Sequence, residues 1–359
     1  MARLGDYVTI RTGKLDANAS SENGEYPFFT CSVTPLKIDT YSYDCECVLV
    51  AGNGDLNVKY YNGKFNAYQR TYIIESNDKN VLSVPYLYYF LDKYVETLRT
   101  QAIGGVIKYI KLGNLTEAQI PLISLEEQNK IVENLNKTNS LISDTKNQLQ
   151  KLDELVTSRF IEIFGDPVNN SKGLPELTLP ELGEFGRGVS KHRPRNDPKL
   201  LGGQYPLIQT GEVANSSLYI TEYESTYSEL GFKQSKLWQK GTLCITIAAN
   251  IAKTAILTFD ACFPDSVVGF KANDKTNNIF IHYWFSFFQA ILEAQAPESA
   301  QKNINLKTLS ELKIIVPPID LQNEFATFVE QTHKPKFEVQ QSLDKLETLK
   351  KALMQEYFG

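Results

Sequence analysis

The chain has 359 residues, enough for two or three domains that each have a core. Its composition, 42% hydrophobic and 11% aromatic, is that of a globular protein and excludes a disordered chain. The net charge is −5, which argues mildly against a nucleic-acid partner, although binding depends on the field of one face. Without a long apolar run or an apolar signal core, we expect a soluble, cytoplasmic protein that binds no membrane.

The cysteines and histidines do not form a metal-binding pattern. The five cysteines are odd in number and contain no CxxC pair, and the three histidines are isolated. We therefore expect reduced, partly buried thiols and no metal site.

The first globular part, residues 1–125, has the pattern of short strands with one late helix. Val48–Ala51 and Thr71–Ile74 are rich in β-branched residues and lie beside turn formers, so each predicts a strand. Pro85–Thr100 predicts a helix. This part is predicted to have an α+β fold.

Residues 126–165 predict one long helix. Apolar residues recur every seven positions, with others between them, which is typical of a coiled coil or helical hairpin. The stripe includes Leu135, Ile142, Leu149, Leu152 and Val156. Gly165 and Pro167 are expected to end the helix, and the turn-rich residues 166–177 predict a linker.

The second globular part, residues 178–318, repeats this plan. Leu243–Ala248 predicts a strand and Ile279–Gln295 a helix. Residues 319–359 predict a second long helix, which Pro335 should kink or split. Its apolar stripe includes Val329, Leu343, Leu346 and Leu349. Neither stripe can be buried alone, so the two helices are expected to pack on each other.

An internal repeat organises the whole chain. Residues 108–165 align without gaps onto residues 302–359, at a constant offset of 194. Matched pairs include Lys108 with Lys302, Gln128 with Gln322, and Phe164 with Phe358. The chain is therefore two copies of one unit, each a variable globular part followed by a shared helix.

The charge is distributed unevenly over these parts. Each long helix carries 7 acidic and 5 basic residues, while residues 165–319 carry 15 of each. The globular parts are thus close to neutral, which neither supports nor excludes DNA binding.

Basic and amide side chains in turn-rich segments of both parts are the candidate DNA-binding residues. Cations neutralise phosphates, arginine can also contact guanine, and asparagine and glutamine suit adenine. For any one of them, an ordinary solvated surface loop remains the alternative. In the first part the candidates are Arg11, Lys14, Asn53, Lys64, Tyr68, Gln69, Arg70 and Lys108. In the second they are Arg187, Lys191, Arg193, Arg195, Gln209, Thr210, Asn250, Lys253, Gln301, Lys302 and Asn303.

No set of residues forms a candidate catalytic site. The glycines around Asn53 predict a turn between strands, because the motif lacks the Gly-Lys-Ser/Thr ending of a phosphate loop. Asp265 and Glu311 match the residue types of a nuclease metal-binding motif. They lie far apart in the sequence, however, and a metal nuclease needs its ligands clustered.

These features together resemble the specificity subunits of type I restriction-modification systems, the HsdS family. Two variable regions alternate with two shared helical regions, and short phrases agree along the whole chain. The phrases are Leu4-Gly-Asp, Leu182-Gly-Glu, Gln301-Lys-Asn-Ile-Asn, Leu125-Glu-Glu-Gln128, Val316-Pro-Pro-Ile-Asp-Leu-Gln322 and Phe164-Gly165. One departure is Ala252, where the family often has glycine.

The resemblance implies that each globular part is a target recognition domain that reads one half of a bipartite site in double-stranded DNA. The helices would form an antiparallel coiled coil that spaces the halves and docks the methyltransferase subunits, of which we expect two. Their stripe residues are therefore also the candidate partner-binding residues. A restriction subunit would join the complex.

The resemblance also implies that this chain is not an enzyme and needs no cofactor. The methyltransferase subunits would hold S-adenosylmethionine and methylate adenine N6, and the restriction subunit would use ATP and magnesium. Two alternatives stay open: a coiled-coil scaffold that does not touch DNA, and a metal-dependent nuclease.

Overall fold

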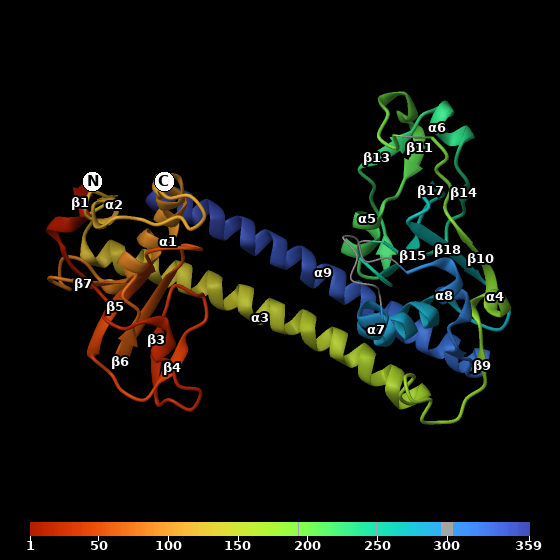
Figure 1. Ribbon diagram of the computed structural model, residues 1–359, viewed down its shortest axis with the longest axis horizontal. Coiled ribbons are helices and arrows are strands. Elements are labelled where there is room, and N and C mark those ends of the chain that lie inside the picture. Colours follow the sequence, from red (N-terminus) through yellow and green to blue (C-terminus); the bar gives the residue numbers. More distant parts are fainter. Residues whose placement is uncertain (193, 249, 296–303) are drawn as a thin grey trace. The chain divides into compact units, whose positions relative to one another are not determined.

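The computed structural model describes residues 1–192, 194–248, 250–295 and 304–359. The chain forms two compact units: unit 1 comprises residues 1–147 and 340–359, and unit 2 comprises residues 148–339. Both chain termini therefore belong to unit 1 (Figure 1). Within the described ranges, no helix has an apolar stretch long enough to cross a lipid bilayer.

Unit 1 is built around a curled six-stranded sheet. The strand order is β2-β7-β5-β6-β3-β4, and only the β3–β6 pairing is parallel. A separate pair joins β1 to β8. The strands are β1 (Ala2–Arg3), β2 (Val8–Thr12), β3 (Tyr26–Phe29), β4 (Leu36–Ile38), β5 (Tyr43–Ala51), β6 (Val58–Ala67), β7 (Thr71–Ser76) and β8 (Gln119–Ile120). The helices that belong wholly to this unit are α1 (Val84–Gln101) and α2 (Leu112–Thr116).

Alternate residues of β5 face two different apolar clusters. Val48 and Val50 join the core beneath α1, while Cys47 and Leu49 join a second core inside the curl of the sheet. This alternation is the period of two that a strand imposes on its side chains. The β5 run therefore predicts a strand correctly, although the strand starts earlier than its most apolar residues.

Unit 2 carries a five-stranded sheet of order β10-β18-β15-β16-β12 and a four-stranded sheet of order β13-β11-β17-β14. A separate pair joins β9 to β19. The strands are β9 (Glu176–Leu177), β10 (Gly183–Arg187), β11 (Leu201–Leu207), β12 (Tyr219–Ile220), β13 (Ser225–Tyr227), β14 (Leu237–Trp238), β15 (Leu243–Thr246), β16 (Thr254–Leu257), β17 (Ala261–Cys262), β18 (Val267–Ala272) and β19 (Ile314–Ile315). The helices are α4 (Leu179–Leu182), α5 (Thr210–Asn215), α6 (Glu229–Lys233), α7 (Asn278–Gln295) and α8 (Leu306–Glu311).

Two long helices pass through both units. They are α3 (Leu125–Phe164) and α9 (Ile319–Phe358). In unit 1, Lys146 of α3 pairs with Glu347 of α9 at 2.8 Å, and in unit 2, Arg159 pairs with Glu324 at 2.8 Å. Early α3 therefore lies beside late α9, and late α3 beside early α9, so the helices are antiparallel. The predicted α+β fold with two globular parts and a pair of long helices is confirmed.

The helix boundaries also test three local expectations. Gly165, at φ 79°, ends α3 as predicted, and its N–H donates to Ile161 O at 2.7 Å. Pro335 does not split α9, which continues without interruption to Phe358. A proline removes one backbone donor, and the rest of the helix is held by its packing on α3. The units divide each long helix in the middle, so the predicted domain boundaries remain a prediction.

A buried glutamine ties the start of each long helix to the loop before α1 or α7. Gln128 donates to Val81 O and Ile123 O at 2.7 and 2.9 Å and accepts from Ser83 N at 2.9 Å. Gln322 makes the matching bonds to Lys275 O, Pro317 O and Asn277 N at 3.1, 2.8 and 3.1 Å. Both side chains are fully buried, and every partner is also shifted by 194 residues. The repeat in the sequence is thus a repeat of contacts.

The last phenylalanine of each long helix packs in the opposite unit from the one where that helix starts. Phe164, at the end of α3, contacts Phe280 of α7 with ring centres 5.0 Å apart. Phe358, at the end of α9, contacts Tyr86 of α1 at 5.2 Å. Each unit is therefore completed by an aromatic residue from the helix of the other repeat.

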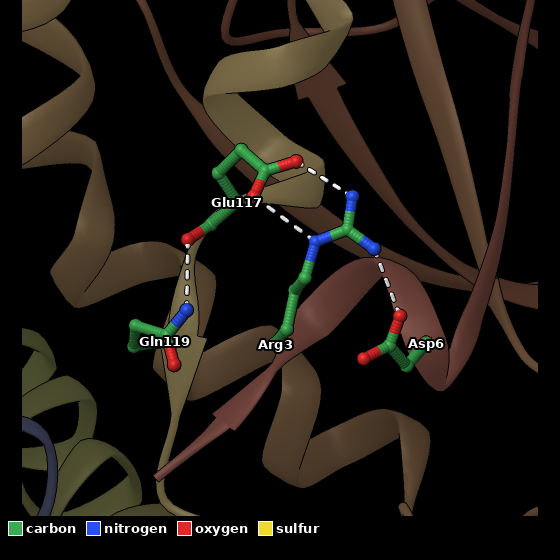
Figure 2. Close-up of polar contacts among 4 residues, drawn as sticks. All are labelled: Arg3, Asp6, Glu117 and Gln119. Atoms are coloured by element: carbon green, nitrogen blue, oxygen red, sulfur yellow. Dashed lines mark hydrogen bonds and ion pairs between the residues drawn. The ribbon is translucent and has the colours of Figure 1, made fainter.

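Arg3 holds strand β1 to the segment that precedes α3 (Figure 2). Its Nε and Nη2 donate to the two carboxylate oxygens of Glu117 at 3.0 and 2.6 Å, and its Nη1 donates to Asp6 at 2.9 Å. Gln119 Nε2 donates to the Glu117 carbonyl oxygen at 3.2 Å. The hydrogen bonds from Arg3 lower the pKa of the Glu117 carboxyl. Because the group is exposed, solvent weakens its contribution to stability.

Candidate nucleic-acid interface

Four segments of unit 1 meet at one place, which we call loop cluster 1: residues 13–16, 52–57, 68–70 and 99–111. Each segment follows or precedes a strand or helix of the unit, so the sheet fixes its ends. Backbone hydrogen bonds join the segments in series: Gly13 N to Thr71 O at 3.0 Å, Gln69 N to Leu15 O at 2.9 Å, Gly52 N to Arg70 O at 2.8 Å, Gly54 N to Lys108 O at 2.9 Å, and Ile110 N to Gly52 O at 2.9 Å. The cluster is therefore a single, internally bonded surface.

Close backbone approach explains the glycine that opens the first segment. A Cβ atom on Gly13 would lie 2.1 Å from Ala67 O, too close for any side chain. In unit 2, a Cβ atom on Gly188 would lie 2.2 Å from Phe263 O. The same constraint thus holds at the start of the matching loop in each unit.

Loop cluster 1 brings together six of the eight candidates of the first part: Lys14, Asn53, Tyr68, Gln69, Arg70 and Lys108. The side chains of these residues are exposed or half-buried. Gln69 Nε2 donates to Asp16 at 2.6 Å, which orients that amide.

The two other candidates lie outside loop cluster 1. Arg11, in β2, is paired with Glu75 of the neighbouring strand and lies 5.6 Å from the ring centre of Tyr43. Lys64, in β6, lies 4.7 Å from the ring centre of Tyr41. Arg11 is thus already neutralised by a carboxylate, and Lys64 belongs to a different surface.

Loop cluster 1 is positively charged, although the net charge of the chain is −5. Loop cluster 1 carries five cations and two carboxylates: Lys14, Arg70, Arg99, Lys108 and Lys111, with Asp16 and Asp55. Arg99 pairs with Asp55 at 3.3 Å. Among the described residues, no carboxylate lies within 4.0 Å of the charged nitrogens of the other four cations. The sequence analysis missed Lys111, although it lies three residues after Lys108 in the repeated segment.

Unit 2 builds a matching surface, loop cluster 2, from the described residues 187–192, 194–197, 247–248, 250–253 and 263–266. The joining bonds are Gly188 N to Val267 O at 2.9 Å, Val189 N to Phe263 O at 3.1 Å, and Ile247 N to Ser266 O at 3.0 Å. Ile304 N donates to Ile247 O at 2.9 Å, as Ile110 N does to Gly52 O in unit 1. Both units therefore assemble their loops by the same backbone pattern.

Loop cluster 2 contains five of the described candidates: Arg187, Lys191, Arg195, Asn250 and Lys253. Gln209 and Thr210 lie next to it at the start of α5, where Ile208 N donates to Cys262 O at 2.9 Å. Four further candidates, Arg193, Gln301, Lys302 and Asn303, lie outside the described residues.

The two carboxylates considered for a nuclease have separate partners. Asp265 pairs with Arg195, and Glu311 lies 3.7 Å from Lys307. The position of Glu311 in the other repeat is Glu117, which binds Arg3 in the salt bridge of Figure 2. In the part of the chain that the structure describes, no three histidine, cysteine or acidic residues gather as a metal site. Arg195 is accordingly less available to DNA than its sequence context indicates.

The connection between β15 and β16 contains a non-glycine residue in the left-handed region. Ala252 has φ 57°, and its N–H donates to Thr246 O at 2.9 Å. Thr246 Oγ1 also accepts from Lys253 N at 3.1 Å. The turn that presents Asn250 and Lys253 is therefore held by Thr246, at the cost of a strained alanine.

Most of the apolar stripe on the long helices is not available to a partner. Leu135, Val156, Val329 and Leu343 are buried, and the first three belong to the unit cores. Ile142, Leu149, Leu152 and Leu346 are half-buried, and only Leu349 is exposed. Packing within each unit covers these four side chains, and the partner-binding role predicted for the stripe remains a prediction.

The comparisons with known proteins agree with this architecture. The model of the type I restriction modification DNA specificity domain matches residues 1–154 and again residues 176–350. The chain belongs to this family. It is 28% identical over 361 residues to the EcoDI specificity subunit of Escherichia coli, covering 91% of this chain and 80% of that protein. It is 22% identical to the EcoBI specificity subunit of the same organism, covering 68% of this chain and 58% of that protein.

Solved structures of the family have the same fold. The S subunit from M. genitalium superposes with a TM-score of 0.67 at 16% identity, covering 100% of this chain and 95% of that one. A chain from a study of type I complex assembly and conformational transition superposes with a TM-score of 0.50 at 15% identity, covering 99% of this chain and 96% of that one. The recognition of the specificity family from the sequence is confirmed.

Proposed function

We propose that the chain selects DNA for a type I restriction-modification complex, with each unit reading one half of a bipartite target. The observation that carries this proposal is the presence of matching loop clusters in the two units. Loop cluster 1 has five cations and two carboxylates, and the described part of loop cluster 2 has four cations and two carboxylates. Such clusters suit phosphate contacts, while the neighbouring Asn53, Gln69 and Asn250 suit base edges. Membership in the specificity family supports the same reading.

The chain itself has no proposed catalytic role. We expect methyltransferase subunits to bind S-adenosylmethionine and to methylate adenine, and a restriction subunit to use ATP and magnesium. This chain would then need no cofactor, and its contribution would be the choice of sequence.

Binding of the assembled complex to a library of duplexes tests the proposal. We expect enrichment of one bipartite sequence, and replacing residues 174–318 by those of a related subunit should change one half-site only. Enrichment of no sequence would contradict the proposal and favour the scaffold alternative. A triple replacement of Lys14, Arg70 and Lys108 by alanine should reduce the slope of log affinity against log salt by about 3, since each phosphate contact contributes about 0.9.

We propose that methyltransferase subunits dock at two exposed leucines. Leu155 of α3 and Leu349 of α9 occupy the same position of the repeat, and they are 50% and 47% exposed. Equivalent surfaces would bind two copies of one partner. We therefore expect Leu155→Ser or Leu349→Ser to leave one bound methyltransferase subunit and the double variant to leave none, measured by mass photometry.

Leu141→Ser is the matched control for this experiment. Leu141 is 53% exposed on α3, but the other repeat has Pro335 at its position, so the two helices cannot share this contact. Loss of both methyltransferase subunits from the Leu141 variant alone would contradict docking at the paired leucines.

A further inference from the structure

The segment between α1 and α2 of unit 1 ends in an apolar tip. Val106 is fully exposed and Ile107 is 61% exposed. Ile103, Tyr109 and Leu112, in the same segment, are exposed as well. Single apolar residues on a surface need no explanation, but five within ten residues form a patch that a partner would cover.

The base of this tip is fixed. Ile103 and Tyr109 exchange two backbone hydrogen bonds, N to O at 3.0 Å and 2.8 Å. Gly104 has φ 120°, and a Cβ atom there would lie 2.6 Å from Ile107 O, so the turn requires glycine. Tyr72, in strand β7 of the sheet, donates a hydrogen bond from its Oη to Ile110 O at 3.2 Å. The chain thus presents the two side chains on a hairpin rather than on a loose loop.

The tip belongs to loop cluster 1. Lys108 and Lys111 follow it in the chain, and Lys108 O accepts the hydrogen bond from Gly54 that joins the hairpin to the loop after β5. The surrounding surface is cationic, which favours a polyanion over an apolar protein surface. An apolar tip that is followed by two lysines and belongs to a cationic loop cluster suits a groove that has phosphates along its rims and bases on its floor.

We propose that Val106 and Ile107 enter the major groove of the half-site read by unit 1 and contact the 5-methyl group of a thymine. This inference rests on the proposed function and adds a specificity determinant to it. The thymine methyl is the apolar group that the base edges display in the major groove, and apolar side chains recognise it by burying it. The lysines hold the backbone while the tip distinguishes thymine from the other bases.

The test uses the assembled complex and its target duplex, with each thymine replaced in turn by deoxyuridine, which lacks only the methyl group. At one thymine of the half-site of unit 1, we expect the wild-type complex to lose about 4-fold in affinity, the effect of about 0.8 kcal/mol for one buried methyl. The double variant Val106→Ser, Ile107→Ser should bind the thymine duplex about 10-fold more weakly. It should also no longer respond to deoxyuridine at that position.

Two control variants separate this contact from other effects. Lys108→Ala should keep the response to deoxyuridine but reduce the salt slope by about 1, whereas the serine variant should keep the salt slope. Val81→Ser removes an apolar residue that is 39% exposed in the loop after β7, away from loop cluster 1. This variant should change neither the response to deoxyuridine nor the salt slope. The second repeat has Ala300 and Gln301 at the tip positions, so Val106→Ala with Ile107→Gln should also abolish the response.

Three results would overturn the inference. An unchanged deoxyuridine response in the serine variant would show that the methyl group is read elsewhere. Loss of methyltransferase subunits from the variant without DNA, seen by mass photometry, would make the tip a protein contact. Increased fluorescence of a 2-aminopurine beside the site, without any deoxyuridine effect, would make it a wedge between bases. If the wild-type complex selected no sequence at all, the proposed function would fail instead.

Discussion

In unit 2, His282 and Lys336 line a cavity of about 270 Å³ between α7 and the long helices, whereas unit 1 has Tyr88 and Ile142 at the same positions of the repeat. The framework around these positions is shared, including the buried glutamine at the start of each long helix. The two units therefore share the buried glutamines that hold the long helices, but they differ in the side chains that lie between α1 or α7 and the long helices. This difference gives the two units different responses to acid.

His282 is the main titrating group of that contrast. Its Nδ1 lies 2.9 Å from Thr254 Oγ1, and burial, with a smaller effect of Lys336, lowers its pKa to about 4. In unit 1, burial raises the pKa of Asp92 on α1. A lowered histidine pKa makes folding less favourable as pH falls, whereas a raised aspartate pKa makes it more favourable. Acid should therefore weaken unit 2 relative to unit 1.

The largest expected effect tests what the units share. Gln128→Ala should destabilise unit 1, and Gln322→Ala unit 2, by about 4 kcal/mol each, because buried backbone groups lose their hydrogen-bond partners. Hydrogen exchange followed by mass spectrometry can assign each loss, with peptides from α1 reporting unit 1 and peptides from α7 reporting unit 2.

Gln150→Ala is the matched control, since that exposed amide binds only Glu154 among the described residues. A loss below about 1 kcal/mol for either buried glutamine would mean that the anchors do not support the units. So would equal losses in both units from one substitution.

The second prediction concerns what the units do not share. Between pH 6.5 and pH 4, unit 2 should lose as much as about 3 kcal/mol, because the unfolded chain binds a proton at His282 that the folded chain does not. His333 faces the same cavity, and burial lowers its pKa as well. Urea unfolding at pH 6.5 and pH 4, followed separately for the two units, measures the difference.

His282→Gln should remove much of this pH dependence while leaving unit 1 unchanged. If unit 1 were destabilised as strongly as unit 2 over the same pH interval, the contrast between the units would not come from this histidine.

A smaller effect is expected at the turn of loop cluster 2. Ala252→Gly should stabilise unit 2 by about 1 kcal/mol, because glycine adopts a positive φ without the clash that alanine meets. The corresponding connection in unit 1 already has Gly54, at φ 71°. Thermal unfolding of the two chains gives the comparison. Ala214→Gly, within α5, is the control and should destabilise, so a gain in both variants would rule out relief of strain at Ala252.

The smallest effect is expected for the salt bridge between Arg3 and Glu117 in Figure 2. In unit 2 the repeat counterpart of Glu117, Glu311, pairs with Lys307 instead. Arg3→Ala should cost unit 1 about 0.5 kcal/mol, since its partners are exposed to solvent. The loss should shrink further in 0.5 M salt. A cost above about 2 kcal/mol would show that β1 depends on this ion pair.

Most of the fold could be predicted from the apolar periodicity of the long helices and from the internal repeat. The end of α3 follows from the heptad pattern and the glycine at 165. The offset of 194 corresponds to matching hydrogen bonds of Gln128 and Gln322. The loop clusters could be predicted because turn formers mark the ends of strands. Whether a cation in them is free could not, because Arg11 and Arg195 pair with carboxylates 64 and 70 residues away in the sequence. The apolar tip at Val106 was missed because exposure depends on the hairpin that presents it.

The exchange of terminal aromatics between repeats has a consequence for how the protein is made. Unit 2 is continuous in the chain, but unit 1 lacks Met354 and Phe358 of its core until the second half of α9, which follows all of unit 2, has been synthesised. The usual order, in which the N-terminal domain completes first during translation, is therefore reversed here. A stop codon within the last turns of α9 would spare unit 2 and leave unit 1 incomplete, although most of unit 1 lies far from that lesion in the sequence.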